Sequence, residues 1–348
     1  MTATLLCFML VLAPAPDAVD DLLAEAARFY DGAASYDGFE EDMAAARAAR
    51  LALIDLARTC PDAEWPAMGD RLIAGLGSED RGVWLACCQV LSRRDPEGLA
   101  VALLPALQDG NGSGRAALTA DALARMGRRL SPGTRSAAAA VLAQRIEDLL
   151  RPCDRERMLA ALGSMGDAAT DHLLRVAADA GLLELVRSAM PHALASTGDA
   201  RALPVLLSLH EGANSDGRRI ASVLALGHLV RRIDDDGQSA DQAVASIRAD
   251  FESPPSPAVA AAAGLALARA GYLSADADGA RVFQLAEDPA ARKNALRAVL
   301  ESRMPLDSGQ MQVIETYAQD EGSSPAVRKI ASALLAAQEA APLGGSAE

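Results

Sequence analysis

The chain has 348 residues, of which 51% are apolar and 3% aromatic, and its formal net charge is −14. Its apolar content is therefore mainly alanine, leucine and valine. Alanine and leucine favour helices, and the β-branched and aromatic runs that build strands are nearly absent. Strong net acidity also opposes non-specific binding to DNA, RNA or anionic lipid. The composition predicts an all-α protein and argues against nucleic acid as its partner.

The first segment, residues 1–17, contains an apolar run from Leu5 to Ala13. This run has the length of a signal-peptide core and is too short to span a bilayer. No lysine or arginine precedes it, and Pro14 follows the best cleavage point. Two interpretations stay open. A signal peptide would favour export, periplasmic or secreted, over a cytoplasmic location, whereas an apolar segment would pack on the first helix. No other stretch is long and apolar enough to cross a membrane.

Helices separated by short turns rich in glycine and proline are expected along the rest of the chain. The first two are predicted over 18–30 and 39–58 and form an N-terminal helical cap, residues 18–62. Residues 63–340 are predicted to form a helical-repeat array, and 341–348 a disordered tail.

Several predicted helices begin with a capping oxygen followed by proline. The cap accepts an otherwise unpaired backbone N–H, which is worth about 1 kcal/mol. Proline in the first helical position gives up no hydrogen bond. The five pairs are Asp95–Pro96, Ser131–Pro132, Ser256–Pro257, Asp288–Pro289 and Ser324–Pro325.

The last three of these starts repeat in detail, because their caps at 256, 288 and 324 lie 32 and 36 residues apart. In each, alanine stands seven residues after the cap and leucine or valine four residues later. These positions are Ala263 and Leu267, Ala295 and Val299, and Ala331 and Leu335, and of them we expect Leu267 and Leu335 in the core. A period of this size with two helices per unit is typical of an α-solenoid.

The chain resembles the HEAT-like repeat family, including the variant found in phycobilisome lyases. Pro325–Lys329 is similar to the start of a second HEAT helix, and Leu103–Leu107 and Ala202–Leu207 are similar to the proline-bearing first helix. The resemblance covers residues 63–340 and is looser over 131–166. It implies a right-handed superhelix of about eight to ten antiparallel helix pairs, with a concave face that often grips a partner.

Familiar catalytic motifs are absent from the sequence. Neither Lys293 nor Lys329 is followed by serine or threonine, which excludes a Walker phosphate loop. There is no Gly-x-Ser-x-Gly elbow and no Cys-x-x-Cys pair. The adjacent Cys87 and Cys88 are interpreted as small buried hydrophobic residues. The sequence therefore predicts a protein without catalytic residues, bound metal or cofactor.

The four histidines fall in one stretch, at His172, His192, His210 and His228, one on each of four successive predicted helices. Neighbouring helix axes lie about 8–10 Å apart, whereas metal ligands converge to about 2 Å from the ion. We therefore expect partly buried or helix-end histidines rather than a shared site. The HEAT-like iron enzyme deoxyhypusine hydroxylase uses several His-Glu pairs, and this chain has one, His210–Glu211, so a di-iron site lacks its ligands.

Charge is unevenly distributed along the chain. Residues 17–46 hold nine acidic residues and one arginine, whereas residues 111–160 hold nine arginines and five acidic residues. This basic band could receive an acidic partner or the chain's own acidic N-terminal part. The alternative is that its arginines are solvated beside carboxylates. The band lacks the aromatic residues of a single-stranded nucleic-acid platform. The candidate partner-binding residues are Arg115, Arg125, Arg128, Arg129 and Arg135.

These observations predict a non-catalytic scaffold that binds another protein through its concave face, because a solenoid leaves a long groove free. The main alternative is a ligand-binding or bilin-lyase-like enzyme of the phycobilisome-lyase type. A nucleic-acid binder using the basic band is the third possibility.

Overall fold

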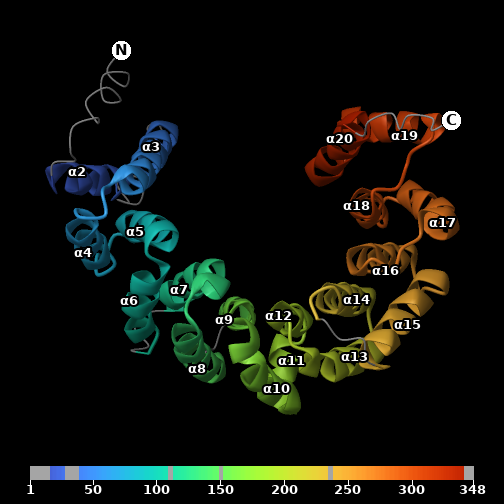
Figure 1. Cartoon of the computed structure of the whole chain (residues 1–348), viewed down its shortest axis with the longest axis horizontal. Helices are drawn as coiled ribbons and strands as arrows, with labels where there is room; N and C mark the ends of the chain where they lie inside the picture. Colours follow the sequence, from blue (N-terminus) through green and yellow to red (C-terminus); the bar gives the residue numbers. More distant parts are fainter. Residues whose placement is uncertain (1–15, 28–38, 109–112, 149–151, 234–237, 341–348) are drawn as a thin grey trace. The chain divides into compact units, whose positions relative to one another are not determined.

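Helix-forming residues determine the architecture, and every secondary-structure element that the computed structural model describes is a helix, as predicted (Figure 1). The described residues are 16–27, 39–108, 113–148, 152–233 and 238–340. The apolar run from Leu5 to Ala13 and the tail 341–348 lie outside them. None of the described helices is long and apolar enough to cross a bilayer.

The chain divides into two compact units, residues 1–165 and 166–348. The helices of the N-terminal unit are α2 (Pro16–Ala27), α3 (Phe39–Thr59), α4 (Trp65–Gly75), α5 (Arg81–Arg94), α6 (Pro96–Gln108), α7 (Ser113–Met126), η2 (Gly127–Arg129), α8 (Pro132–Asp148) and α9 (Pro152–Ser164). The helices of the C-terminal unit are η3 (Gly166–Ala169), α10 (Thr170–Ala178), α11 (Ala180–Val186), α12 (Met190–Thr197), η4 (Ala200–Ala202), α13 (Leu203–Glu211), α14 (Asp216–Val230), α15 (Gln238–Glu252), α16 (Pro257–Ala270), α17 (Ala275–Glu287), α18 (Arg292–Ser302), α19 (Ser308–Gln319) and α20 (Pro325–Ala340).

Within each unit, alternate helices pack on one another and form a row. In the N-terminal unit α3, α5, α7 and α9 contact in turn, and α6 packs on α8. In the C-terminal unit α12, α14, α16, α18 and α20 contact in turn, and the intervening helices α13, α15, α17 and α19 pack against them (Figure 1). Every second helix therefore meets an equivalent helix before and after it.

The core of the C-terminal unit centres on α16, where every residue from Val259 to Ala268 is buried. Leu267 is buried, as predicted, and so are Ala263, Ala295, Val299 and Ala331 at the matching positions of the repeat pattern. Leu335 is the exception: it is half-buried, and its neighbour Leu334 takes the core place. Residues three and four positions after Ala331 share one helix face. In α20, which packs on α18 and α19, the residue three positions after Ala331 is Leu334, and its side chain is the buried one.

Four of the five predicted helix starts are confirmed. The side chains of the caps accept the N–H three residues on: Asp95 from Gly98 at 2.9 Å, Ser131 from Thr134 at 3.3 Å, Ser256 from Val259 at 3.4 Å and Ser324 from Val327 at 3.3 Å. The fifth prediction is wrong, because α18 begins at Arg292 rather than Pro289. The Asp288 carboxylate accepts the N–H groups of Ala290 at 2.8 Å and Ala291 at 3.2 Å, and these local bonds close a turn before the helix.

Arginines tie the end of one helix to the end of the helix two places earlier. Arg94 donates to the Cys60 carbonyl at 3.3 Å, Arg129 to Ser92 at 2.7 Å, and Arg232 to Ser196 at 2.8 Å. The paired residues are 34, 37 and 36 positions apart. Each guanidinium thus satisfies carbonyls that have no partner within their own helix. This contact links α3 to α5, α5 to α7, and α12 to α14.

Glycine allows the rows to pack closely. A Cβ atom on Gly227 of α14 would lie 2.6 Å from the Cβ and the carbonyl oxygen of Ala266 on α16. A Cβ atom on Gly127 would lie 2.3 Å from the Ser164 carbonyl oxygen at the end of α9. Any larger side chain at these positions would push the two helices apart.

We expect Gly227→Ala to lower the free energy of unfolding by about 1–3 kcal/mol, because overpacking forces neighbouring backbone to shift. Gly217→Ala is the matched control on the same helix, since nothing lies within 4 Å of its added Cβ. That change should be neutral or stabilise by up to about 1 kcal/mol. Urea unfolding followed by circular dichroism measures both, and equal stability of the two variants would contradict the close packing of α14 on α16.

Candidate functional site

Helix α3 carries a second stripe of residues besides its buried one. Its buried stripe includes Ala46, Ala49, Leu53 and Leu56. The other stripe repeats at helical spacing i, i+3, i+4 and i+7 and consists of Arg47, Arg50, Leu51 and Ile54. One face of α3 thus packs on the core, while another presents two arginines and two aliphatic side chains.

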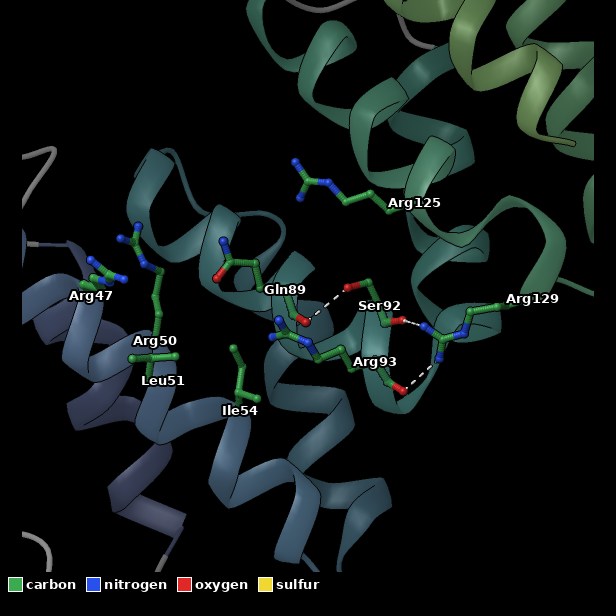
Figure 2. Close-up of a pocket in the computed structure, with 9 residues that line it drawn as sticks. All are labelled: Arg47, Arg50, Leu51, Ile54, Gln89, Ser92, Arg93, Arg125 and Arg129. Atoms are coloured by element: carbon green, nitrogen blue, oxygen red, sulfur yellow. Dashed lines mark hydrogen bonds between the residues drawn. The ribbon is translucent and has the colours of Figure 1, made fainter. Parts of the chain in front are cut away.

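That second face forms one wall of a groove of about 580 Å³ in the N-terminal unit. Helix α5 contributes Gln89, Ser92 and Arg93, and the α7–η2 segment contributes Arg125 and Arg129. Figure 2 shows these side chains around the space between the three segments. Among the described residues the lining contains five arginines and no carboxylate, so this part of the groove is strongly positive within a protein of net charge −14.

The arginines of the groove differ in their bonding. Arg129 is held by the end of α5, donating to the carbonyl oxygens of Ser92 at 2.7 Å and Arg93 at 2.9 Å (Figure 2). By contrast, the side chains of Arg47, Arg50, Arg93 and Arg125 make no hydrogen bond or ion pair with any described residue. Four guanidinium groups thus keep their donors for an external acceptor, and their mutual repulsion would be relieved by an anion.

The structure places the predicted partner-binding residues in different settings. Arg125 and Arg129 line the groove, whereas Arg128 is exposed on η2 outside its lining and Arg135 is half-buried on α8. Arg115 lies on α7, but its side chain is outside the described part of the chain.

Three of the lining arginines, Arg47, Arg50 and Arg93, were not among the residues predicted from the sequence. The basic band covers residues 111–160 only. Arg47 directly follows the acidic stretch 17–46, so the net charge of the sequence around it is negative. The helical spacing of the second stripe on α3 was the available signal.

The cysteines beside this groove are buried, which confirms the prediction for Cys87 and Cys88. Burial raises the pKa of Cys87 to about 12. Burial also raises the pKa of Cys88, against a smaller opposing effect of Arg125. Both thiols therefore stay protonated near neutral pH and are poor nucleophiles.

The histidines occupy separate environments. His192 is exposed, His172 and His228 are half-buried beside Arg175 and Arg232, and His210 is buried. No group of three or more histidine, cysteine, aspartate or glutamate residues in the described ranges could hold a metal ion.

A buried polar cluster surrounds His210. Its Nδ1 lies 3.2 Å from the Ser222 hydroxyl, and its Nε2 lies 3.4 Å from Asp250. Asp250 also accepts three hydrogen bonds from Nε and Nη2 of Arg219, the shortest at 2.7 Å. The order serine, histidine, aspartate is that of a hydrolytic triad. Ser222 is only 1% exposed, however, so no substrate carbonyl can approach its hydroxyl, and the cluster joins α13, α14 and α15.

The groove offers binding chemistry: guanidinium groups, one amide, one hydroxyl and two aliphatic side chains, with no carboxylate, imidazole or thiol in its lining. No protein family model matches the chain, and no curated protein matches its sequence. The functional conclusion is therefore drawn from the geometry and charge of the groove.

Lowering the pH from about 7 to about 5.5 should destabilise the protein, and His210→Gln should reduce this pH dependence. Burial is the main cause that lowers the pKa of both His210 and His172. The unfolded chain, whose histidines titrate near 6.5, then binds more protons than the folded chain. Stability is thus lost as the pH falls below about 6.5, by at most about 1.4 kcal/mol per pH unit for one histidine.

Urea unfolding at several pH values across this window measures how the free energy of unfolding changes with pH. The carboxyl groups whose pKa is lowered, such as Asp199 and Asp320, act only at more acidic pH and do not interfere. An unchanged slope in His210→Gln would show that His210 is not held neutral in the folded protein.

Proposed function

We propose that the protein is a non-catalytic binding module of HEAT-like repeats that holds an acidic segment of another protein in the arginine-lined groove. The observation that carries the proposal is the set of four guanidinium groups, from Arg47, Arg50, Arg93 and Arg125. None of them bonds to a described residue, and the described lining of the groove has no carboxylate. Arginine presents a planar fork of donors that matches a carboxylate in a bidentate manner.

The packing within each unit supports the repeat part of the proposal. A HEAT-like solenoid needs equivalent helices that stack on one another, and α3, α5 and α7 contact in turn, as do α14, α16 and α18. The arginine-to-carbonyl contacts recur at separations of 34, 37 and 36 residues, close to the cap spacings of 32 and 36 in the sequence. Such a stack leaves one side of each row free for a partner.

Buried arginine–carboxylate hydrogen bonds contribute about 1.5–3 kcal/mol each. Removing two of these hydrogen bonds together would weaken binding more than tenfold. No feature of the described residues specifically favours a lyase, so the small-ligand alternative is treated as an outcome of the experiment below.

The test is a tagged pull-down from an extract of the source cell, with captured proteins identified by mass spectrometry. The wild-type chain should retain a stoichiometric protein partner, and Arg47→Glu/Arg50→Glu should lose it. The matched control is Arg58→Glu/Lys329→Glu, which makes the same change in net charge at exposed positions outside the groove. This control should bind as the wild type does.

Retention of the partner by Arg47→Glu/Arg50→Glu would place the contact elsewhere. A small molecule carried through in place of a protein would favour the ligand-binding alternative.

A further inference from the structure

The groove has an apolar side as well as a basic one. Leu51 is 55% exposed, which makes it one of the most exposed large aliphatic residues in the described ranges, and Ile54 lies one turn further along the same stripe of α3. Single exposed aliphatic residues are common on protein surfaces. Here both stand in the lining, next to Arg47 and Arg50, so a bound segment would cover them while it meets the arginines (Figure 2).

We infer that the occupant of the groove is a short segment of a partner protein in which acidic residues are interspersed with aliphatic ones. Its carboxylates would meet Arg47, Arg50, Arg93 and Arg125, and an aliphatic side chain would cover Leu51 and Ile54. This inference rests on the proposed function and adds to it the chemistry that selects the partner. Covering these aliphatic side chains removes apolar surface from water, so the aliphatic contact contributes to selectivity.

The lining distinguishes such a peptide from nucleic acid. Single-stranded nucleic acid is held by aromatic side chains on which bases stack, and no aromatic residue lines this groove. The net charge of −14 also repels a long polyanion, whereas a short acidic segment interacts mainly with the local arginines.

The size of the groove sets the length of the segment. It extends over α3, α5 and α7, and neighbouring helix axes lie about 8–10 Å apart, so the distance across is roughly 16–20 Å. About six residues cover that distance in an extended conformation, and about twelve in a helix. A peptide of about twelve residues is therefore long enough in either conformation.

Arg129 is a poor choice for testing the groove, because its guanidinium already binds the end of α5 and its loss would disturb that helix. Arg47, Arg50 and Leu51 make better probes, since they lie in the middle of α3 on the face that does not pack on the core. Substitutions there should leave the fold intact, which circular dichroism and the melting temperature verify.

The experiment measures fluorescence anisotropy of three labelled probes with the full chain. One peptide of about twelve residues contains glutamate and leucine, a second replaces each leucine by serine, and the third probe is an oligothymidylate of the same charge. We expect the glutamate–leucine peptide to bind at least tenfold more tightly than either other probe. Arg47→Glu/Arg50→Glu should weaken binding of the glutamate–leucine peptide at least tenfold. Leu51→Ser should lower the ratio of the two peptides' affinities, glutamate–leucine over serine, at least threefold. Arg58→Glu is the control and should change neither the affinity for the glutamate–leucine peptide nor the ratio of the two peptides' affinities.

Equal binding of the two peptides, with both lost in Arg47→Glu/Arg50→Glu, would overturn the aliphatic requirement and leave the proposed function intact. Tighter binding of the oligothymidylate would overturn the inference in favour of nucleic acid. If no probe binds, while the pull-down partner is retained by Arg47→Glu/Arg50→Glu, the groove is not the contact. If no probe binds and no partner is captured, the proposed function fails as well.

Discussion

The close approach of alternate helices, which small side chains permit, is the constraint on which both units depend. In α16 ten consecutive residues from Val259 to Ala268 are buried, most of them alanine, so helices can pack around it on all sides. Gly227 lies so near Ala266 that even a methyl group would clash. Packing at this density leaves little room for large side chains, and the 3% aromatic content of the chain agrees with it.

Close packing also brings the groove together. Arg47 and Arg50 come from α3, Arg93 from α5 and Arg125 from α7, and these helices contact in turn. Their charges add within one groove because the helix axes are only about 8–10 Å apart. The same helix packing that stabilises the unit therefore concentrates positive charge in the groove, although the chain as a whole is acidic. Stability and the proposed binding surface depend on a single arrangement.

The sequence predicted what local chemistry determines and missed what lateral packing determines. Caps such as Ser256 act on the N–H three residues away, so the starts of their helices could be read from composition. The predicted start at Asp288 was wrong because the Asp288 carboxylate accepts from two successive backbone N–H groups, those of Ala290 and Ala291, and so closes a turn before the helix begins at Arg292. The prediction that Leu335 lies in the core was wrong because Leu334 and Leu335 share one helix face and Leu334 is the buried residue. In the groove, Arg125 and Arg129 were found, but the neighbouring arginines of α3 and α5 become visible only once those helices stand beside α7.

Counting arginines cannot separate those that hold the fold from those that are free to bind. Arg94, Arg129 and Arg232 stand at or just beyond the ends of their helices and donate to carbonyls at the end of an earlier helix. Arg47 and Arg50 lie in the middle of α3 and make no hydrogen bond or ion pair with a described residue. Position along the helix does not by itself separate the two groups, because Arg93 and Arg125 lie in the last turns of α5 and α7 and still make no hydrogen bond or ion pair with a described residue. What separates them is the bond that each side chain makes: Arg129 binds the carbonyls at the end of α5, whereas the other arginines of the groove supply charge that a partner can recognise.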